Sequence, residues 1–230
     1  MDLSIIIPLY NQGHYLEECL ESISKNEARK IKSKETIVVD DCSSDNSFEV
    51  AKKLQDKFKF ELIQTPQNSK LPGARNFALK QASGKYVICL DSDDKIPPNY
   101  IHETHRTLIK KNVDVAYADS QCFDYKTSRY QWPEFSVLLL KRGPFINCSA
   151  MYKKEIWDKV GGYKEDMIYG WEDYEFWVSA YEHGYKFKKC NRTELYYRMK
   201  DDGMGATAAT KHQQEIWGKL KEYHPNFFGG

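Results

Sequence analysis

Three carboxylates lie within four residues in the motif Asp91-Ser92-Asp93-Asp94, directly after an apolar run at residues 86–90. Acidic side chains this close repel one another and lose hydration unless a positive group lies among them. Carboxylate oxygens are hard ligands that suit Mg²⁺ or Mn²⁺, so the motif indicates a divalent-metal site. The alternative is a solvated acidic turn, in which Asp or Ser caps a helix that begins near Pro97 and Pro98.

The elements around the motif favour a ligand site. The apolar run predicts a strand buried on both faces of a parallel sheet, and such sheets bind ligands at the carboxyl ends of their strands. Strand-like runs at 3–9 and 35–40 also end in polar loops, which contain Tyr10-Asn11 and Asp40-Asp41. We expect the three loops to converge on one crevice. The chain has no glycine-rich dinucleotide or P-loop motif.

Strands and helices alternate along the chain. We predict early helices at 14–26, around 48–54 and at 74–82, with a strand at 60–64. Later we predict a helix ending near 111, strands at 113–118 and 144–151, helices at 153–160 and 171–183, short strands at 185–190 and 193–199, and a last helix at 208–223. Residues 120–143 form either short antiparallel strands or a mobile flap. The alternation predicts right-handed βαβ units and a mostly parallel sheet.

Composition limits the kinds of partner. Among 230 residues, 34 Lys and Arg balance 33 Asp and Glu, which argues against a dedicated nucleic-acid binder. The six cysteines are scattered without zinc-like spacing, as expected for reduced thiols in the cytoplasm. No apolar run is long enough for a transmembrane helix, and the N-terminus leads into a strand rather than a signal peptide. We expect a cytoplasmic protein, with contact to the inner face of a membrane left open.

Five motifs in a fixed order carry a family resemblance: Pro8-Leu9-Tyr10-Asn11, Asp40-Asp41-Cys42-Ser43-Ser44-Asp45, Gly73-Ala74-Arg75-Asn76, Asp91-Ser92-Asp93-Asp94 and Trp171-Glu172-Asp173. Together they resemble the family 2 glycosyltransferases, inverting enzymes of the GT-A fold, over roughly residues 3–200. The resemblance implies an α/β GT-A nucleotide-diphospho-sugar transferase fold. We expect a mostly parallel central sheet with helices on both faces and a small antiparallel element in the second half.

The resemblance also implies a division of the chain and a donor site. Residues 1–205 would be the catalytic domain (1–95 the nucleotide-binding half, 96–205 the acceptor-side half), and 206–230 a C-terminal helix and tail. The implied nucleotide-sugar-binding residues are Pro8, Tyr10, Asn11, Asp40, Asp41, Arg75, Asp91, Ser92 and Asp93.

Each residue of that set has an implied role. Pro8 and Tyr10 would wall the base, and Asp41 would hydrogen-bond its ring. Asp40 would support the loop, and Arg75 would lie near the base or the diphosphate. Asp93 would meet the ribose or the metal, and Asp94, with or without Asp91, would coordinate a Mn²⁺ or Mg²⁺ ion that bridges the diphosphate.

The motif Trp171-Glu172-Asp173 supplies candidate catalytic carboxylates. Inversion needs a base that deprotonates the acceptor hydroxyl as it attacks, and Asp173 resembles that base. Glu172 is adjacent, but consecutive helix residues point about 100° apart, so only one faces the reacting carbon. The alternative is that both acids simply favour the first turn of a helix. Trp171, on the acceptor side, either stacks on a sugar or anchors the helix.

One departure concerns the metal. Many relatives carry a His shortly after a Tyr-Arg pair, whereas here Tyr197-Arg198-Met199 is followed by Lys200. Either Lys200 neutralises the diphosphate, or Asp201 or Asp202 assists the ion. The glycines of Gly203-Met204-Gly205 predict a flexible loop.

The sequence therefore predicts a metal-assisted inverting glycosyltransferase that uses a UDP-linked sugar donor and a saccharide or lipid-linked saccharide acceptor. One alternative is a non-catalytic nucleotide-sugar-binding domain of the same fold. A sugar-nucleotide pyrophosphorylase is disfavoured because no basic, glycine-rich triphosphate loop follows the first strand.

Overall fold

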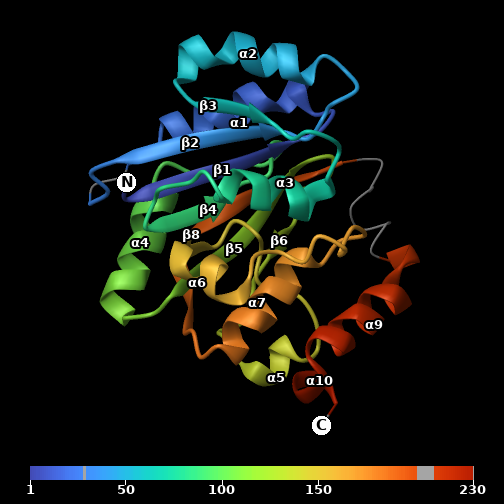
Figure 1. The fold of residues 1–230 in the computed structure, drawn as a ribbon. Helices are drawn as coiled ribbons and strands as arrows, with labels where there is room; N and C mark the ends of the chain where they lie inside the picture. Colours follow the sequence, from blue (N-terminus) through green and yellow to red (C-terminus); the bar gives the residue numbers. More distant parts are fainter. Residues whose placement is uncertain (28–29, 201–209, 230) are drawn as a thin grey trace.

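The computed structural model describes residues 1–27, 30–200 and 210–229 (Figure 1). The first half alternates strands and helices as expected. Its elements are β1 (Leu3–Leu9), α1 (Gly13–Ser24), β2 (Lys34–Asp40), α2 (Ser47–Phe58), β3 (Glu61–Gln64), α3 (Lys70–Leu79), β4 (Tyr86–Cys89) and α4 (Tyr100–Lys111). Helix α3 begins earlier than predicted, because Pro72 falls in its first turn, where a missing N–H breaks no helical hydrogen bond.

The strands form one sheet with the order β3-β2-β1-β4-β7-β5-β6, and β8 pairs with β5. The later strands are β5 (Val115–Asp124), β6 (Arg129–Tyr130), β7 (Met151–Lys153) and β8 (Phe187–Met199). Strands β1 to β4 run parallel, and β8 runs parallel to β5. Strands β6 and β7 pair antiparallel with their neighbours. The mostly parallel sheet with a small antiparallel element is confirmed.

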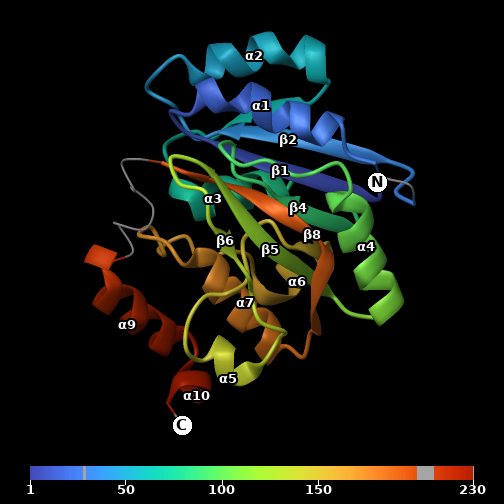
Figure 2. The ribbon, with the colours of Figure 1, turned by 180° about the vertical axis from the view of Figure 1, so that it is seen from behind.

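Helices cover both faces of the sheet, as two views from opposite sides show (Figures 1 and 2). In β1, Ile5 and Ile7 pack with α1, α2 and α4, whereas Ile6 packs with α3 and with the later helices α6 (Lys154–Val160) and α7 (Glu172–Glu182). Side chains alternate between the faces of a strand, so a strand covered on both sides needs a continuous apolar run. This explains why β1 and β4 lack polar alternation.

Two predictions in the second half are wrong. The predicted strand at 144–151 is a loop up to β7, because Asn147 accepts a turn hydrogen bond from the amide of Ala150 and donates its own amide to the Ala118 carbonyl. The two short strands predicted at 185–190 and 193–199 are one strand, β8, whose register against β5 shifts between Ala118 and Asp119. In the segment left open at 120–143, β5 continues, β6 pairs with it, and a short helix α5 (Val137–Leu140) follows.

The C-terminal segment packs against α7. Helices α9 (Gln213–Tyr223) and α10 (Pro225–Phe228) contribute Ile216, Leu220 and Phe227 to the core that contains α7. The predicted glycine loop and Asp201 and Asp202 lie outside the described residues. The division of the chain at residues 95 and 205 stays a prediction.

No helix in the described part of the chain is both long and apolar enough to span a membrane. All six cysteines are free.

Candidate active site

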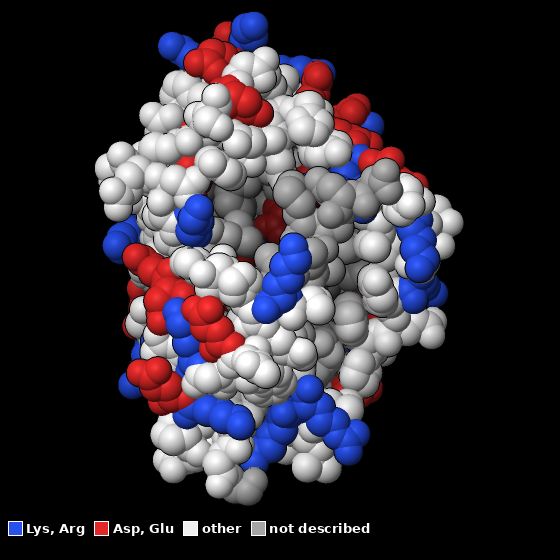
Figure 3. All heavy atoms as spheres, turned by 90° about the vertical axis from the view of Figure 1, so that its right-hand side faces the viewer, with Lys and Arg blue, Asp and Glu red and all other residues white. Residues whose placement is uncertain are grey.

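A cavity of about 400 Å³ lies at the carboxyl ends of β1, β2 and β4. The space-filling view of this side shows a hollow with acidic atoms at its floor (Figure 3). Six of the predicted site residues line the cavity, namely Pro8, Tyr10, Asp41, Asp91, Ser92 and Asp93. The convergence of three strand-end loops, expected from the sequence, is therefore observed.

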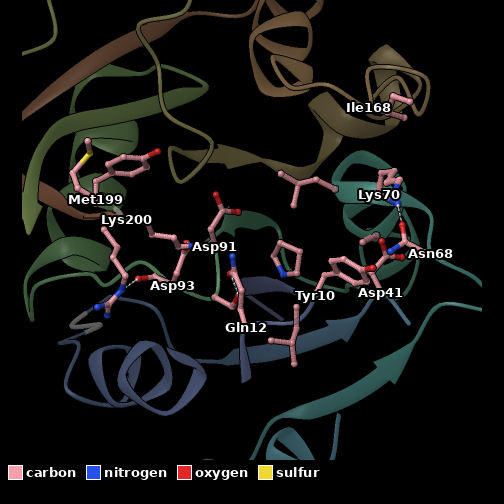
Figure 4. A pocket seen from close by; sticks show the side chains of 17 residues that line it. Tyr10, Gln12, Asp41, Asn68, Lys70, Asp91, Asp93, Ile168, Met199 and Lys200 are labelled. Carbon is pink, nitrogen blue, oxygen red and sulfur yellow. Dashed lines mark hydrogen bonds and ion pairs between the residues drawn. The ribbon is translucent and has the colours of Figure 1, made fainter. Parts of the chain in front are cut away.

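One end of the cavity is formed by Asp41, Asn68 and Lys70, with Tyr10 beside them (Figure 4). The Oδ1 atom of Asp41 accepts hydrogen bonds of 2.8 Å from the hydroxyl of Thr65 and from the amide and hydroxyl of Ser69. These bonds fix the carboxylate before any ligand arrives. Tyr10 is 45% exposed, so its ring is free to cover a flat group at this end.

Asp40 and Asn11 hold loops and do not line the cavity. The fully buried Asp40 carboxylate accepts hydrogen bonds from the Ser43 amide and the Gln64 side chain. Asn11 has a positive φ of 53°, and its side-chain oxygen accepts the amides of Ser44 and Asp45. Both side chains therefore shape the loops that carry Tyr10 and Asp41, which agrees with the supporting role expected of Asp40.

The acidic motif separates into residues that face the cavity and one that does not. Asp91, Ser92 and Asp93 line the cavity, and the Ser92 hydroxyl donates to Gln12 at 2.8 Å. Asp94 is buried, its Oδ1 accepts the Arg198 amide at 2.8 Å, and its Oδ2 has no hydrogen-bond partner among the described residues. Asp94 is thus placed to support the motif rather than to reach a ligand in the cavity.

Burial and mutual repulsion raise the pKa values of two carboxylates in the motif. Burial and the charge of Asp91 raise the pKa of Asp93. Burial and the charges of Asp93 and Asp91 raise the pKa of Asp94 well above its usual range. Both shifts come first from burial and then from the neighbouring carboxylates, and a cation bound beside Asp93 would relieve the repulsion among them.

Arg75 lies behind the cavity instead of in it. Its side chain is 1% exposed, and its Nη2 donates to Asp91 Oδ1 at 2.7 Å. Its Nη1 donates to Glu172 on α7. We predicted a position near the base or the diphosphate, but Arg75 is not among the residues that line the cavity. A buried guanidinium with two carboxylates joins the end of β4 to the start of α7.

Asp173 follows Glu172 at the start of α7. The carboxylate is half-buried, and it lies outside the lining of the cavity. Burial and the neighbouring Glu172 charge raise the pKa of Asp173 to about 7, against an opposing effect of Arg75. A carboxyl group with a pKa near neutrality is suited to accept and release protons at physiological pH. Glu172, the other predicted catalytic residue, is buried and held by Arg75.

Trp171 anchors the helix. Its backbone has a positive φ of 63°, and its ring packs edge-on against Tyr174 and against Trp217 of α9, with ring centroids 5.7 and 5.4 Å apart. These contacts are those expected if Trp171 anchors the helix, the second of the two roles considered for it. The acceptor-side role of Trp171 stays a prediction.

Several residues of the site were not predicted. The cavity is also lined by Gln12, Asn68, Lys70, Leu71, Ile168, Tyr197, Arg198 and Met199. Cys148 lies behind Asp91, with Sγ 3.5 Å from Asp91 Oδ2. Lys200, one alternative for neutralising the diphosphate, lines the cavity, and its Nζ is 2.5 Å from Asp93 Oδ2. The polar loop that contains Gln12 and the Tyr197-Arg198-Met199 motif before Lys200 were the sequence signals for these residues.

A divalent ion fits this site if protein carboxylates and a phosphate-containing ligand coordinate it together. Within residues 1–27, 30–200 and 210–229, no cluster of three or more His, Cys, Asp or Glu could hold a metal ion alone. Mg²⁺ commonly takes one or two carboxylates and completes its shell with phosphate oxygens and water. Asp93 and Asp91, the two carboxylates of the motif that face the cavity, match that mode.

Residues 4–164 match the family model described as glycosyl transferase family 2. The chain belongs to this family. It is 27% identical over 223 residues to the poly(ribitol-phosphate) β-N-acetylglucosaminyltransferase TarS of Staphylococcus aureus, covering 94% of this chain and 39% of TarS. It is 29% identical over 195 residues to the chondroitin synthase of Pasteurella multocida, covering 83% of this chain and 20% of that protein. The chain thus spans less than half the length of these relatives.

Solved structures confirm the predicted GT-A fold. A crystal structure of S. aureus TarS residues 1–349 matches with a TM-score of 0.79 at 24% identity, covering 98% of this chain and 66% of that one. The mannosyltransferase PcManGT of Pyrobaculum calidifontis, in complex with GDP-Man and Mn²⁺, matches with a TM-score of 0.75 at 18% identity, covering 96% and 64%. The predicted membership of the family 2 glycosyltransferases is confirmed by the match to the family model.

Proposed function

We propose that this chain is the catalytic domain of an inverting glycosyltransferase. It transfers a sugar from a nucleoside-diphosphate donor, UDP-linked by preference, to a hydroxyl of a saccharide or lipid-linked saccharide. The observation that carries the proposal is the single cavity that has Tyr10 and Asp41 at one end and Asp91 and Asp93 at the other (Figure 4). TarS, a relative that matches 94% of this chain, has been crystallised with UDP-GlcNAc and with UDP, which supports a UDP-linked donor.

The two ends of the cavity bind different parts of the donor. The base lies against Pro8 and Tyr10 and is hydrogen-bonded by the fixed carboxylate of Asp41. The diphosphate lies toward Asp93 and Asp91, which would hold a Mn²⁺ or Mg²⁺ ion. When bound, that ion supplies positive charge for the leaving diphosphate. Asn68 and Lys70 complete the base end.

Asp173 serves as the general base. The acceptor oxygen forms a bond to the anomeric carbon while the bond from that carbon to the diphosphate oxygen breaks. The hydroxyl proton passes to the Asp173 carboxylate, and the nucleoside diphosphate leaves with the electron pair. Because the pKa of Asp173 is raised to about 7, the carboxylate is a stronger base than an ordinary aspartate and is still ionised in part at neutral pH. Arg75 orients the start of α7 and Asp91 together.

We also propose that the enzyme works in the cytoplasm, because all six of its thiols are free.

A thermal-shift panel tests the donor site. UDP, GDP, CDP and dTDP are each added with Mn²⁺, with Mg²⁺ or with EDTA, because a ligand that binds only the folded state raises the melting temperature. We expect UDP with an ion to stabilise the protein most. Stabilisation by another nucleotide would change the donor class, and no shift with any nucleotide would favour the alternative of a domain without this activity.

A further inference from the structure

Lys200 places a positive charge at the diphosphate end of the cavity. It follows the last residue of β8, and its Nζ is 2.5 Å from Asp93 Oδ2, with the two side chains 21% and 16% exposed. Figure 4 shows Lys200 and Asp93 at the same end of the cavity. The ammonium group is therefore in reach of the position that the donor diphosphate occupies in the proposed function.

The neighbouring cation, Arg198, is held in place by contacts within the protein. Its Nε donates to the Asp93 carbonyl at 2.8 Å, and its Nη1 donates to Asp124 at 2.7 Å. Its Nη2 donates to Glu18, and its guanidinium lies 4.3 Å from the centre of the Tyr15 ring. A guanidinium with partners on every side cannot turn to a ligand without breaking them. Arg198 therefore shapes this end of the cavity, and a negatively charged ligand there would be bound by a different cation.

Lys200 is held far less tightly. Among the described residues, its ammonium has one ion pair, to Asp93, and one ring contact, to Tyr15 at 5.4 Å. Lysine carries a compact charge on a flexible stem, and it binds phosphate as a point charge. Small rotations of the side chain would move the ammonium from Asp93 to a diphosphate oxygen in the same cavity.

The acidic motif favours this movement. Asp91 is paired with Arg75, and Asp94 accepts the Arg198 amide, so Lys200 is the partner of the remaining carboxylate, Asp93. In the proposed function a divalent ion binds Asp93. An ammonium group and a divalent ion repel each other and share this carboxylate, so an ion that binds Asp93 weakens its hold on Lys200.

We propose that Lys200 and the divalent ion occupy Asp93 in turn, and that the displaced Lys200 becomes a second cation on the donor diphosphate. This inference rests on the proposed function. Without nucleotide, Lys200 neutralises Asp93. With nucleotide and ion, Asp93 would hold the ion, and Lys200 binds a diphosphate oxygen from the β8 side. Lys200 then stabilises the leaving group.

Two measurements on the full chain test the exchange. The first is UDP affinity by calorimetry, with Mn²⁺ and with EDTA, for the wild type and for Lys200→Met. Losing one charged hydrogen bond to the diphosphate should weaken UDP about tenfold at saturating Mn²⁺ and less in EDTA, where Lys200 stays on Asp93, while uridine, which has no phosphate, should bind equally. Lys70→Met is the matched control, because Lys70 lines the opposite end of the cavity, and there UDP and uridine should change together.

The second measurement is the Mn²⁺ affinity of the nucleotide-free protein. Removal of the competing ammonium in Lys200→Met should raise this affinity several-fold, and Lys200→Arg should not. If Lys200→Met leaves both the UDP affinity at saturating Mn²⁺ and the Mn²⁺ affinity at wild-type values, the exchange is overturned and the proposed function stands. If the wild type binds no UDP under any condition, the proposed UDP donor itself fails.

Discussion

Arg75 and Asp91 are joined by a 2.7 Å hydrogen bond from Nη2 to Oδ1, and the other terminal nitrogen of Arg75 contacts Glu172. This buried guanidinium connects the carboxylate at the end of β4 with the helix that carries Asp173. The carboxylate proposed to face the donor and the helix proposed to carry the base are therefore parts of one hydrogen-bonded unit. A change at Arg75 should disturb both sides, although Arg75 does not line the cavity.

We predict that Arg75→Met destabilises the protein by about 3–5 kcal/mol, because it leaves the buried Glu172 carboxylate without its partner. Urea unfolding followed by circular dichroism measures this change. Arg106→Met is a control: Arg106 forms a more exposed pair with Glu103 on α4, and such pairs contribute about 0–1 kcal/mol. A similar loss for the two variants would contradict the proposed coupling role of Arg75.

Much of this arrangement could be predicted from the sequence, and the reasons are physical. Continuous apolar runs identified β1 and β4 as strands covered on both faces, and polar residues at their carboxyl ends identified the cavity. The role of Arg75 could not be predicted, because a polar residue near a helix start gives no sign of whether it faces a ligand or a buried carboxylate. The loop before β7 was misjudged because hydrogen bonds of Asn147 outweigh the apolar pattern around it. Residues of β8 such as Tyr197 reach the cavity only through long-range pairing with β5.

We predict that transfer activity rises with pH through a midpoint near 7. Only the ionised carboxylate accepts the acceptor proton, and the pKa of Asp173 is raised to about 7 by burial and by Glu172. Initial rates from pH 5 to 9, at saturating donor, measure the profile. A rate that is flat between pH 5 and 8 would contradict Asp173 as the base.

The same raised pKa has a consequence for stability. Between the usual value of 3.8 and about 7, the folded state binds more protons at Asp173 than the unfolded state does. The contribution of Asp173 to the free energy of unfolding should therefore fall as pH rises through this window. Asp173→Asn should remove that fall, and a pH series of urea unfolding curves on both proteins checks it. Identical pH slopes would show that the residue is not perturbed in this way.

His224 links α10 to α7 through two carboxylates, with Nε2 3.1 Å from Glu175 and Nδ1 2.5 Å from Glu182. Burial alone would lower the pKa of His224, but its hydrogen bonds to these two carboxylates raise it above the usual value. Its stabilising contribution is complete below the unfolded pKa near 6.5 and is lost as pH rises through the folded pKa.

We predict that His224→Gln lowers the free energy of unfolding at pH 6 more than at pH 9. Glu175 is fully buried, and its loss of a charged partner should cost about 3 kcal/mol at the lower pH. His183→Gln is the control, because His183 is an exposed histidine at the C-terminal end of α7. An equal effect of His224→Gln at both pH values would refute the charged bridge.

Neutralising Asp93 and neutralising Asp94, the last two carboxylates of the acidic motif, should affect nucleotide binding differently. Asp93→Asn should remove the dependence of UDP binding on Mn²⁺, because Asp93 faces the cavity. Asp94→Asn should retain that dependence, since Asp94 is buried and its Oδ1 position can still accept the Arg198 amide. Calorimetric titrations with and without EDTA distinguish the two. If Asp94→Asn loses the Mn²⁺ dependence of UDP binding, Asp94 is a ligand of the ion.

The measurement that tests the central claim most directly is turnover by Asp173→Asn, with donor binding measured in parallel. Release of UDP from UDP-GlcNAc is followed with a panel of saccharide acceptors, and UDP affinity is measured with Mn²⁺ in the same buffer. Loss of the base should lower the transfer rate by about 10²–10⁴-fold and leave UDP affinity within a factor of two or so. Undiminished transfer by this variant, at wild-type donor affinity, would contradict the assignment of Asp173 and the mechanism built on it.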